Sequence, residues 1–187
     1  MILPIYTYGQ PVLRKVAKDI PNDYPDLEQF INDMYDTLDS SSGIGLAAPQ
    51  VGQSIRVVVI DLDILKEDLP ECEGYRHAFI NPHIIEIDHK SEKITMEEGC
   101  LSIPGINEKV PSYSRIHVTY LDENLLPHDE WVESYLARVM QHEFDHLEGE
   151  MFVDKVSPLR KQLIRNKLRD IMRGRYSASY RTKPARK

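Results

Sequence analysis

The chain has 187 residues, of which 41% are hydrophobic and 28% are charged, and its formal net charge is −7. This length predicts one domain with a core of ordinary size, and the composition excludes a chain that is disordered throughout. Two cysteines argue against a disulfide framework and favour a reducing compartment. Because there is no leader pattern and no apolar run of about 20 residues, we expect a cytoplasmic protein without membrane attachment.

The charge is distributed unevenly along the chain. Residues 155–187 contain twelve Lys or Arg and one acidic residue, a net charge of +11, whereas residues 1–154 carry −18. An acidic body does not suit nucleic-acid binding, so we expect no specific DNA partner. The basic segment is a candidate for such binding, although charge runs are as often simply solvated.

The first predicted helix spans residues 26–38, where apolar residues recur at intervals of three and four. Residues 43–50, Gly-Ile-Gly-Leu-Ala-Ala-Pro-Gln, predict a tight turn that leads into a strand. A phosphate-binding loop is excluded there, because a third glycine at the required offset and a Lys-Ser or Lys-Thr pair are both absent.

Short strands follow in the middle of the chain. Strands are predicted at residues 55–61, 79–80, 83–87, 94–96 and 115–121. Turn residues predict a break at Asn81-Pro82, between the second and third of these strands, and another turn at residues 126–129.

Two further helices are predicted, from Ser134 to Glu148 and from Pro158 to Arg173. Strands outnumber helices, and few helices lie between consecutive strands, which favours an α+β fold with antiparallel sheets over a doubly wound sheet. We expect one domain over residues 1–173 and a basic, disordered tail over residues 174–187.

The strongest functional signal is the pattern His-Glu-x-x-His at residues 142–146. On a helix, His142 and His146 leave the same face and can reach one divalent metal. Glu143 would lie beside that metal, where a carboxylate suits proton transfer. Paired histidines can also be plain surface residues, but these border an apolar helix face, where an unpaired polar cluster would be costly.

A metal held by two histidines needs a third protein ligand. No histidine follows His146, and Glu150, the last glutamate, comes too soon after the helix. The remaining candidate is Cys100, in the upstream segment Glu-Gly-Cys-Leu-Ser, although a lone cysteine is often only a small buried apolar residue. A Cys/His/His set would leave an open position, which is typical of catalytic sites.

Three segments together resemble the peptide deformylases, which remove the formyl group from new bacterial polypeptides: residues 43–50, 98–102 and 141–147. The resemblance implies an α+β fold in which antiparallel β-sheets pack around a central helix that carries His-Glu-x-x-His. The helices predicted at residues 26–38 and 158–173 add one helix in the N-terminal half and one at the C-terminal end.

The resemblance implies roles for individual residues as well. Glu143 would be the proton-transfer residue, and the Gln50 amide and the Leu101 backbone N–H would donate to the developing oxyanion. The metal ligands would be Cys100, His142 and His146. The substrate would be an N-formyl-methionyl nascent peptide, bound by Ile44, Gly45, Glu98, Gly99 and Val139.

The ligand types alone suit zinc, iron, cobalt or nickel. The resemblance implies one divalent ion per chain, with Fe²⁺ ahead of Zn²⁺, Ni²⁺ and Co²⁺. A nascent-chain substrate makes the ribosome the expected target of the basic C-terminal segment. Asn107 departs from many family members, which have an arginine seven residues after the cysteine, and this puts the support of that loop in question.

Two other interpretations remain open on the residues alone. A zincin-type endopeptidase shares His-Glu-x-x-His, but would not use Cys100 as a ligand. A small binding module could hold a structural metal, but such sites are normally closed by four protein ligands. A fourth ligand is not found in the sequence, because Cys72 lies in a polar loop without ligand spacing.

Overall fold

The computed structural model describes residues 1–185. In this part of the chain there are three α-helices, α1 (Leu27–Ser41), α2 (Ser134–Leu147) and α3 (Pro158–Met172). The strands are β1 (Ile5–Tyr6), β2 (Gly45–Ala47), β3 (Val57–Asp61), β4 (Arg76–Ile87), β5 (Lys93–Glu98), β6 (Glu108–Tyr113), β7 (Arg115–Leu121), β8 (Pro127–Glu133) and β9 (Thr182–Lys183). None of the helices described here has the length and apolar character needed to span a bilayer.

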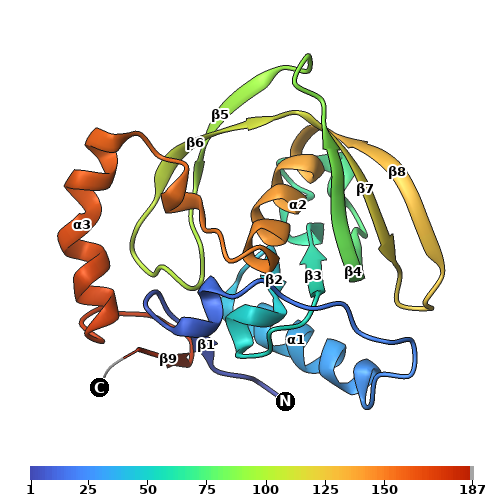
Figure 1. Ribbon diagram of the computed structural model, residues 1–187, viewed down its shortest axis with the longest axis horizontal. Coiled ribbons are helices and arrows are strands. Elements are labelled where there is room, and N and C mark those ends of the chain that lie inside the picture. The colour runs from blue at the N-terminus through green and yellow to red at the C-terminus, as the bar shows by residue number, and fades with distance from the viewer. Residues whose placement is uncertain (186–187) are drawn as a thin grey trace.

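The main sheet has five antiparallel strands in the order β2-β3-β4-β7-β8. Its two faces are covered by different helices, because the side chains of β3 alternate between them. Val58 and Ile60 belong to the apolar cluster that contains Met140 and Phe144 of α2. Val57 and Val59 pack instead in the cluster that holds the buried face of α1. Figure 1 shows α2 at the centre of the molecule, between this sheet and the elements on the other side.

Those other elements are the antiparallel hairpin β5-β6 and the outlying helix α3 (Figure 1). Beneath them lies a third apolar cluster, which contains Ile103, Ile106 and Val110 together with Phe152 and Ile164. The segment between β5 and β6 carries Cys100, which packs against this cluster. The packing of the hairpin thus decides where the predicted third metal ligand is placed.

The prediction of an α+β fold with antiparallel sheets around a central helix is confirmed, and the three predicted helices are present within a few residues of their expected bounds. The predicted break at Asn81-Pro82 is wrong. Strand β4 runs through it with a shift in its register to β7, and Asn81 takes a positive φ of 50°. The pairing of β4 with strands on both sides therefore overrides the local turn preference.

The turn predicted at residues 126–129 is also wrong, since β8 already begins at Pro127. The reversal lies a few residues earlier, where the Asp122 side chain accepts hydrogen bonds from the backbone N–H groups of Asn124 and Leu126. Leu125 in this turn takes a φ of 61°. An aspartate that bonds to the backbone two residues on is a recognised turn former.

Residues 174–185, which were predicted as part of a disordered tail, have a defined conformation in the structure, whereas residues 186 and 187 lie outside the described part of the chain. Strand β9 pairs in parallel with β1 near the N-terminus, as Figure 1 shows. Beside it, the Gln10 amide donates to the carbonyl of Pro184 at 2.8 Å. The basic composition suggested disorder, but Tyr176 and Tyr180 supply packing surface that the charge count does not reveal.

Candidate metal centre and substrate cleft

Helix α2 brings the His-Glu-x-x-His residues to the middle of the molecule. Its apolar side packs against the main sheet through Ala137, Met140, Phe144 and Leu147. The two histidines and Glu143 leave the helix on a different side, toward β2 and the loop that carries Cys100. Both Glu143 and His146 are almost fully buried there.

Cys100, His142 and His146 form a three-ligand cluster. Their potential ligand atoms all lie within 4.8 Å of one another, and Sγ of Cys100 is 3.3 Å from Nε2 of His146. These separations are close to the span of two metal–ligand bonds of about 2.1–2.3 Å each. Burial lowers the pKa of His146, and the nearby His142 lowers it further, so this imidazole is neutral, which is the form that coordinates metals. The residues therefore fit a divalent ion.

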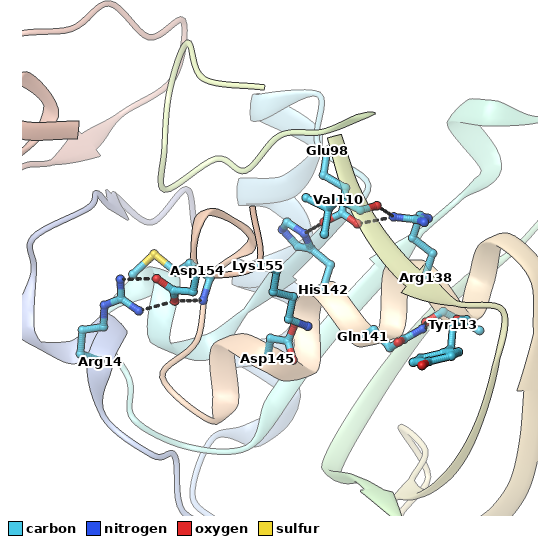
Figure 2. A network of polar contacts seen from close by, with 12 residues as sticks. Arg14, Glu98, Val110, Tyr113, Arg138, Gln141, His142, Asp145, Asp154 and Lys155 are labelled. Carbon is cyan, nitrogen blue, oxygen red and sulfur yellow. Dashed lines mark hydrogen bonds and ion pairs between the residues drawn. The ribbon is translucent and has the colours of Figure 1, made fainter. Parts of the chain in front are cut away.

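Glu98 holds His142 in place (Figure 2). Its Oε2 is 2.9 Å from Nδ1 of His142, which leaves Nε2 of that ring for a metal. Its Oε1 accepts from the Arg138 guanidinium at 2.5 Å. Burial raises the pKa of the Glu98 carboxyl, but His142 and Arg138 lower it by more, so the group is ionised at neutral pH. A carboxylate in this position orients a ligating histidine and increases its basicity.

Arg138 connects this centre to the β5-β6 hairpin. The guanidinium donates to the backbone carbonyls of Val110, at 3.2 Å, and Ile94 in addition to Glu98. Its side chain is only 8% exposed. Sequence reasoning missed this residue, because its partners lie far away in the chain. A signal was present, however: Arg138 is a charged residue four positions before His142, on the same side of α2.

Glu143 is enclosed next to the ligand cluster. Its Oε2 is buried without a hydrogen-bond partner in the described part of the chain. Burial raises the pKa of Glu143 to about 7. Strand β2 approaches closely at this point, since a Cβ on Gly45 would lie only 2.7 Å from Cγ of Glu143. The absence of a side chain at Gly45 is therefore what leaves room for this carboxylate.

Gln50 is fixed with its amide nitrogen toward the same centre. Its Oε1 accepts from the backbone N–H of Ala47 at 2.8 Å, which establishes which end of the amide is the donor. Its Nε2 lies 3.4 Å from Sγ of Cys100 and 3.2 Å from Oγ of Ser102. Gln50 thus presents a neutral N–H donor beside the ligand cluster.

The loop after Cys100 does not depend on an arginine at position 107. The Asn107 side chain packs against Gly99, where a Cβ would overlap it. The nearby base of β6 is held by Arg160, which makes two hydrogen bonds of 2.7 Å to the carboxylate of Glu108. The ion pairs that support this region come from α2 and α3 instead.

A cavity of about 400 Å³ opens next to these residues. The structure places nine of the predicted site residues in its lining besides Cys100, and they are Ile44, Gly45, Gln50, Glu98, Gly99, Leu101, Val139, His142 and Glu143. His146 lies behind the lining as the buried member of the cluster. Residues that sequence reasoning did not single out also line it, among them Met96, Tyr135, Arg138 and Tyr180.

Comparisons with known proteins identify the family. A family model for polypeptide deformylase matches residues 2–162. The chain belongs to the polypeptide deformylase family. Peptide deformylase from Christiangramia forsetii is 47% identical over 188 residues, which cover 97% of this chain and 95% of that protein. The enzyme from Flavobacterium psychrophilum is 43% identical over 190 residues, with 98% and 97% of the two chains covered.

The similarity extends to solved structures. A crystal structure of peptide deformylase from Plasmodium falciparum superposes with a TM-score of 0.80 at 36% identity, covering 91% of this chain and 95% of that one. The chain is therefore a hydrolase that removes the N-formyl group from newly made polypeptides, as the resemblance predicted, and it belongs to a metal-dependent family.

Proposed function

We propose that this deformylase works with one divalent ion held by Cys100, His142 and His146. The observation that carries the proposal is the convergence of the three ligand atoms within 4.8 Å at a cavity that also contains Glu143 and Gln50. A bound ion supplies a Lewis acid, which polarises a carbonyl and lowers the pKa of water, to about 7 in well-studied zinc sites. All other steps belong to side chains and backbone groups of the chain.

Glu143 is the group that moves the proton. Its buried carboxylate accepts a proton from the attacking water as the water oxygen bonds to the formyl carbon. The same group then donates that proton to the amide nitrogen, and the C–N bond breaks to give formate and a free amino terminus. The unpartnered Oε2 of Glu143 supports this role, because no other group within the described residues competes for it.

Gln50 and Leu101 donate hydrogen bonds to the negative charge that develops on the formyl oxygen. Nε2 of Gln50 is fixed beside the ligand cluster, and the Leu101 backbone N–H lies in the loop next to Cys100. Donors that are already in place need no rearrangement when the charge forms, which is why such groups accelerate acyl transfer strongly. The methionine and its peptide would lie against Ile44, Gly45, Glu98, Gly99 and Val139, all in the cavity lining.

Fe²⁺ is the ion we propose, with Zn²⁺, Ni²⁺ and Co²⁺ as alternatives that the same donors accept. We expect Cys100→Ala to lose both the metal and formate release from a formyl-Met tripeptide, because one of the three ligands is removed. Metal analysis of anaerobically purified protein, paired with a formate assay, measures both. Cys72→Ala is the matched control, since Cys72 is buried in another cluster and should have little effect on either quantity.

This variant also separates the proposal from its alternatives. A zincin-type endopeptidase would keep its metal without Cys100, so retention of the ion in Cys100→Ala would contradict the ligand set. A structural metal module would keep the ion in the native protein but release no formate. Among residues 1–185, the cluster contains three candidate ligands, and three protein ligands would leave a position for a reactant.

We also propose that the protein binds the ribosome, in the cytoplasm, through the basic face of α3. Lys161, Arg165 and Arg169 are exposed at intervals of four residues. Reversing these three charges with glutamate should weaken co-sedimentation with ribosomes at low salt and leave tripeptide deformylation unchanged. The matched control reverses Lys15, Lys18 and Lys90, which are exposed elsewhere. Equal sedimentation of both variants would contradict a ribosome site on α3.

A further inference from the structure

The C-terminal segment, residues 176–185, reaches the substrate cleft through one side chain. The Tyr180 hydroxyl donates to the backbone carbonyl of Leu101 at 2.8 Å. The ring is half-buried and lines the cavity with Ser42, Gly43 and Leu101. The family model ends at residue 162 and therefore does not include this segment.

The segment is anchored on both sides of Tyr180. After it, the backbone N–H of Ile5 donates to the carbonyl of Arg181 at 2.9 Å, and β9 pairs with β1. Before it, the Tyr176 ring packs against the third apolar cluster, the one that contains Ile103 and Phe152. The chain is thus restrained on both sides of Tyr180, and this fixes the position of the Tyr180 side chain.

The Tyr180 hydroxyl binds to the loop that carries Cys100, the proposed third metal ligand. The carbonyl of Cys100 accepts from the N–H of Ile103 at 2.9 Å, and the carbonyl of Ser102 accepts from the N–H of Tyr8 at 2.8 Å. Within residues 1–185, the carbonyl between them, that of Leu101, has the Tyr180 hydroxyl as its hydrogen-bond donor. Three successive carbonyls of the loop are therefore fixed, and the middle one depends on the C-terminal segment.

Peptide units are planar, so a hydrogen bond to a carbonyl restrains the N–H of the same unit as well. The unit that contains the Leu101 N–H is held through the Cys100 carbonyl, and the unit that follows is held through Tyr180. These two units flank the Leu101 Cα. Each unit is held by one hydrogen bond and can still rotate about it, so release of the second unit frees ψ of Leu101 and loosens the direction of the N–H in the first. An oxyanion donor acts through its placement, and small displacements are costly.

We propose that Tyr180 is a positioning residue, which aims the Leu101 N–H at the formyl oxygen. The inference rests on the proposed function, because it requires Leu101 to be an oxyanion donor. In this proposal the C-terminal segment restrains the loop that carries Cys100 and Leu101. The rest of the domain supplies the metal ligands and the proton-transfer group.

The decisive experiment compares Tyr180→Phe with Tyr176→Phe. Tyr180→Phe removes only the hydroxyl and keeps the ring in the cleft wall. Tyr176→Phe removes hydroxyl contacts of the same segment to Thr7 and Thr182 without touching Leu101. The measurements are kcat and KM for a formyl-Met tripeptide, the metal content and the thermal midpoint of the loaded enzyme.

We expect Tyr180→Phe to lower kcat about threefold to tenfold, as for the loss of one neutral hydrogen bond, with KM and metal content unchanged. Tyr176→Phe should keep kcat within about twofold, the lower end of that range. An unchanged kcat in Tyr180→Phe, a change confined to KM, or an equal loss of kcat in both variants would overturn the proposal. If Glu143→Ala is inactive while Tyr180→Phe is fully active, only this inference fails and the proposed function stands.

Discussion

Glu143→Ala is expected to bind its metal normally and to lose about 10²–10⁴-fold in kcat, the usual contribution of a general acid–base group. The three ligand atoms come from other residues, so the substitution leaves the ion in place. The reaction loses the acceptor of the water proton and the donor to the departing amine. Metal analysis and tripeptide kinetics on the same preparation test both parts of the expectation.

The pH profile gives a second test of the same residue. Burial raises the pKa of Glu143 to about 7, whereas a cation beside a carboxylate favours its ionised form. In the metal-loaded enzyme, the acid limb of kcat should therefore lie below pH 7. This limb should be absent from the residual activity of Glu143→Ala. Glu150→Gln, at an exposed glutamate beyond α2, is the control and should keep native kinetics.

Full activity in metal-loaded Glu143→Ala would contradict the assignment of proton transfer to this residue. Loss of the metal from the variant would contradict a different step, namely that Glu143 stands beside the ligand set and is not part of it. The two failures are distinguishable because metal content is measured independently of turnover.

The sequence predicted the parts of the site that follow from local spacing. Two histidines four apart on an amphipathic helix must share a face, so the spacing alone pairs His142 with His146. The turn into a strand that was predicted within residues 43–50 is local as well, and β2 begins there at Gly45. Close approach of backbone to a functional group requires glycine, and Gly45 lies directly against Glu143.

The sequence did not predict what depends on long-range packing. Asn81-Pro82 has the composition of a turn, yet pairing on both sides keeps it within β4. The basic tail has the composition of a disordered segment, yet Tyr180 bonds to a loop 79 residues away in the chain. Neither outcome is encoded in a window of neighbouring residues, because each depends on which surface the folded domain presents.

Arg138 is the clearest example of such a residue, and its removal is expected to have the largest effect on stability. Arg138→Met preserves much of the side-chain volume but leaves the buried Glu98 carboxylate with one partner fewer (Figure 2). It also leaves the carbonyls of Ile94 and Val110 without this donor. Both side chains of the ion pair are at most 10% exposed. Breaking a buried pair typically costs about 3–5 kcal/mol.

We therefore expect the free energy of unfolding of metal-free Arg138→Met, measured in urea, to fall by about 3–5 kcal/mol. The midpoint of thermal unfolding should fall by roughly 10 °C, since about 1 kcal/mol corresponds to 2–4 °C in a domain of this size. The loaded variant should release its ion to a chelator faster, because Glu98 no longer holds His142 as firmly. Loss of such a supporting group typically lowers metal affinity about 10- to 100-fold.

Arg160→Met is the matched control for this prediction. Arg160 also binds a buried glutamate, Glu108, but it does so from α3 and has no contact with the ligand cluster. It should lower stability without changing the rate of metal release. The double variant Arg138→Met with Glu98→Gln should recover part of the stability, because the uncompensated charge is gone, but should not recover metal retention. Native metal release in Arg138→Met would show that Glu98 holds His142 without help from Arg138.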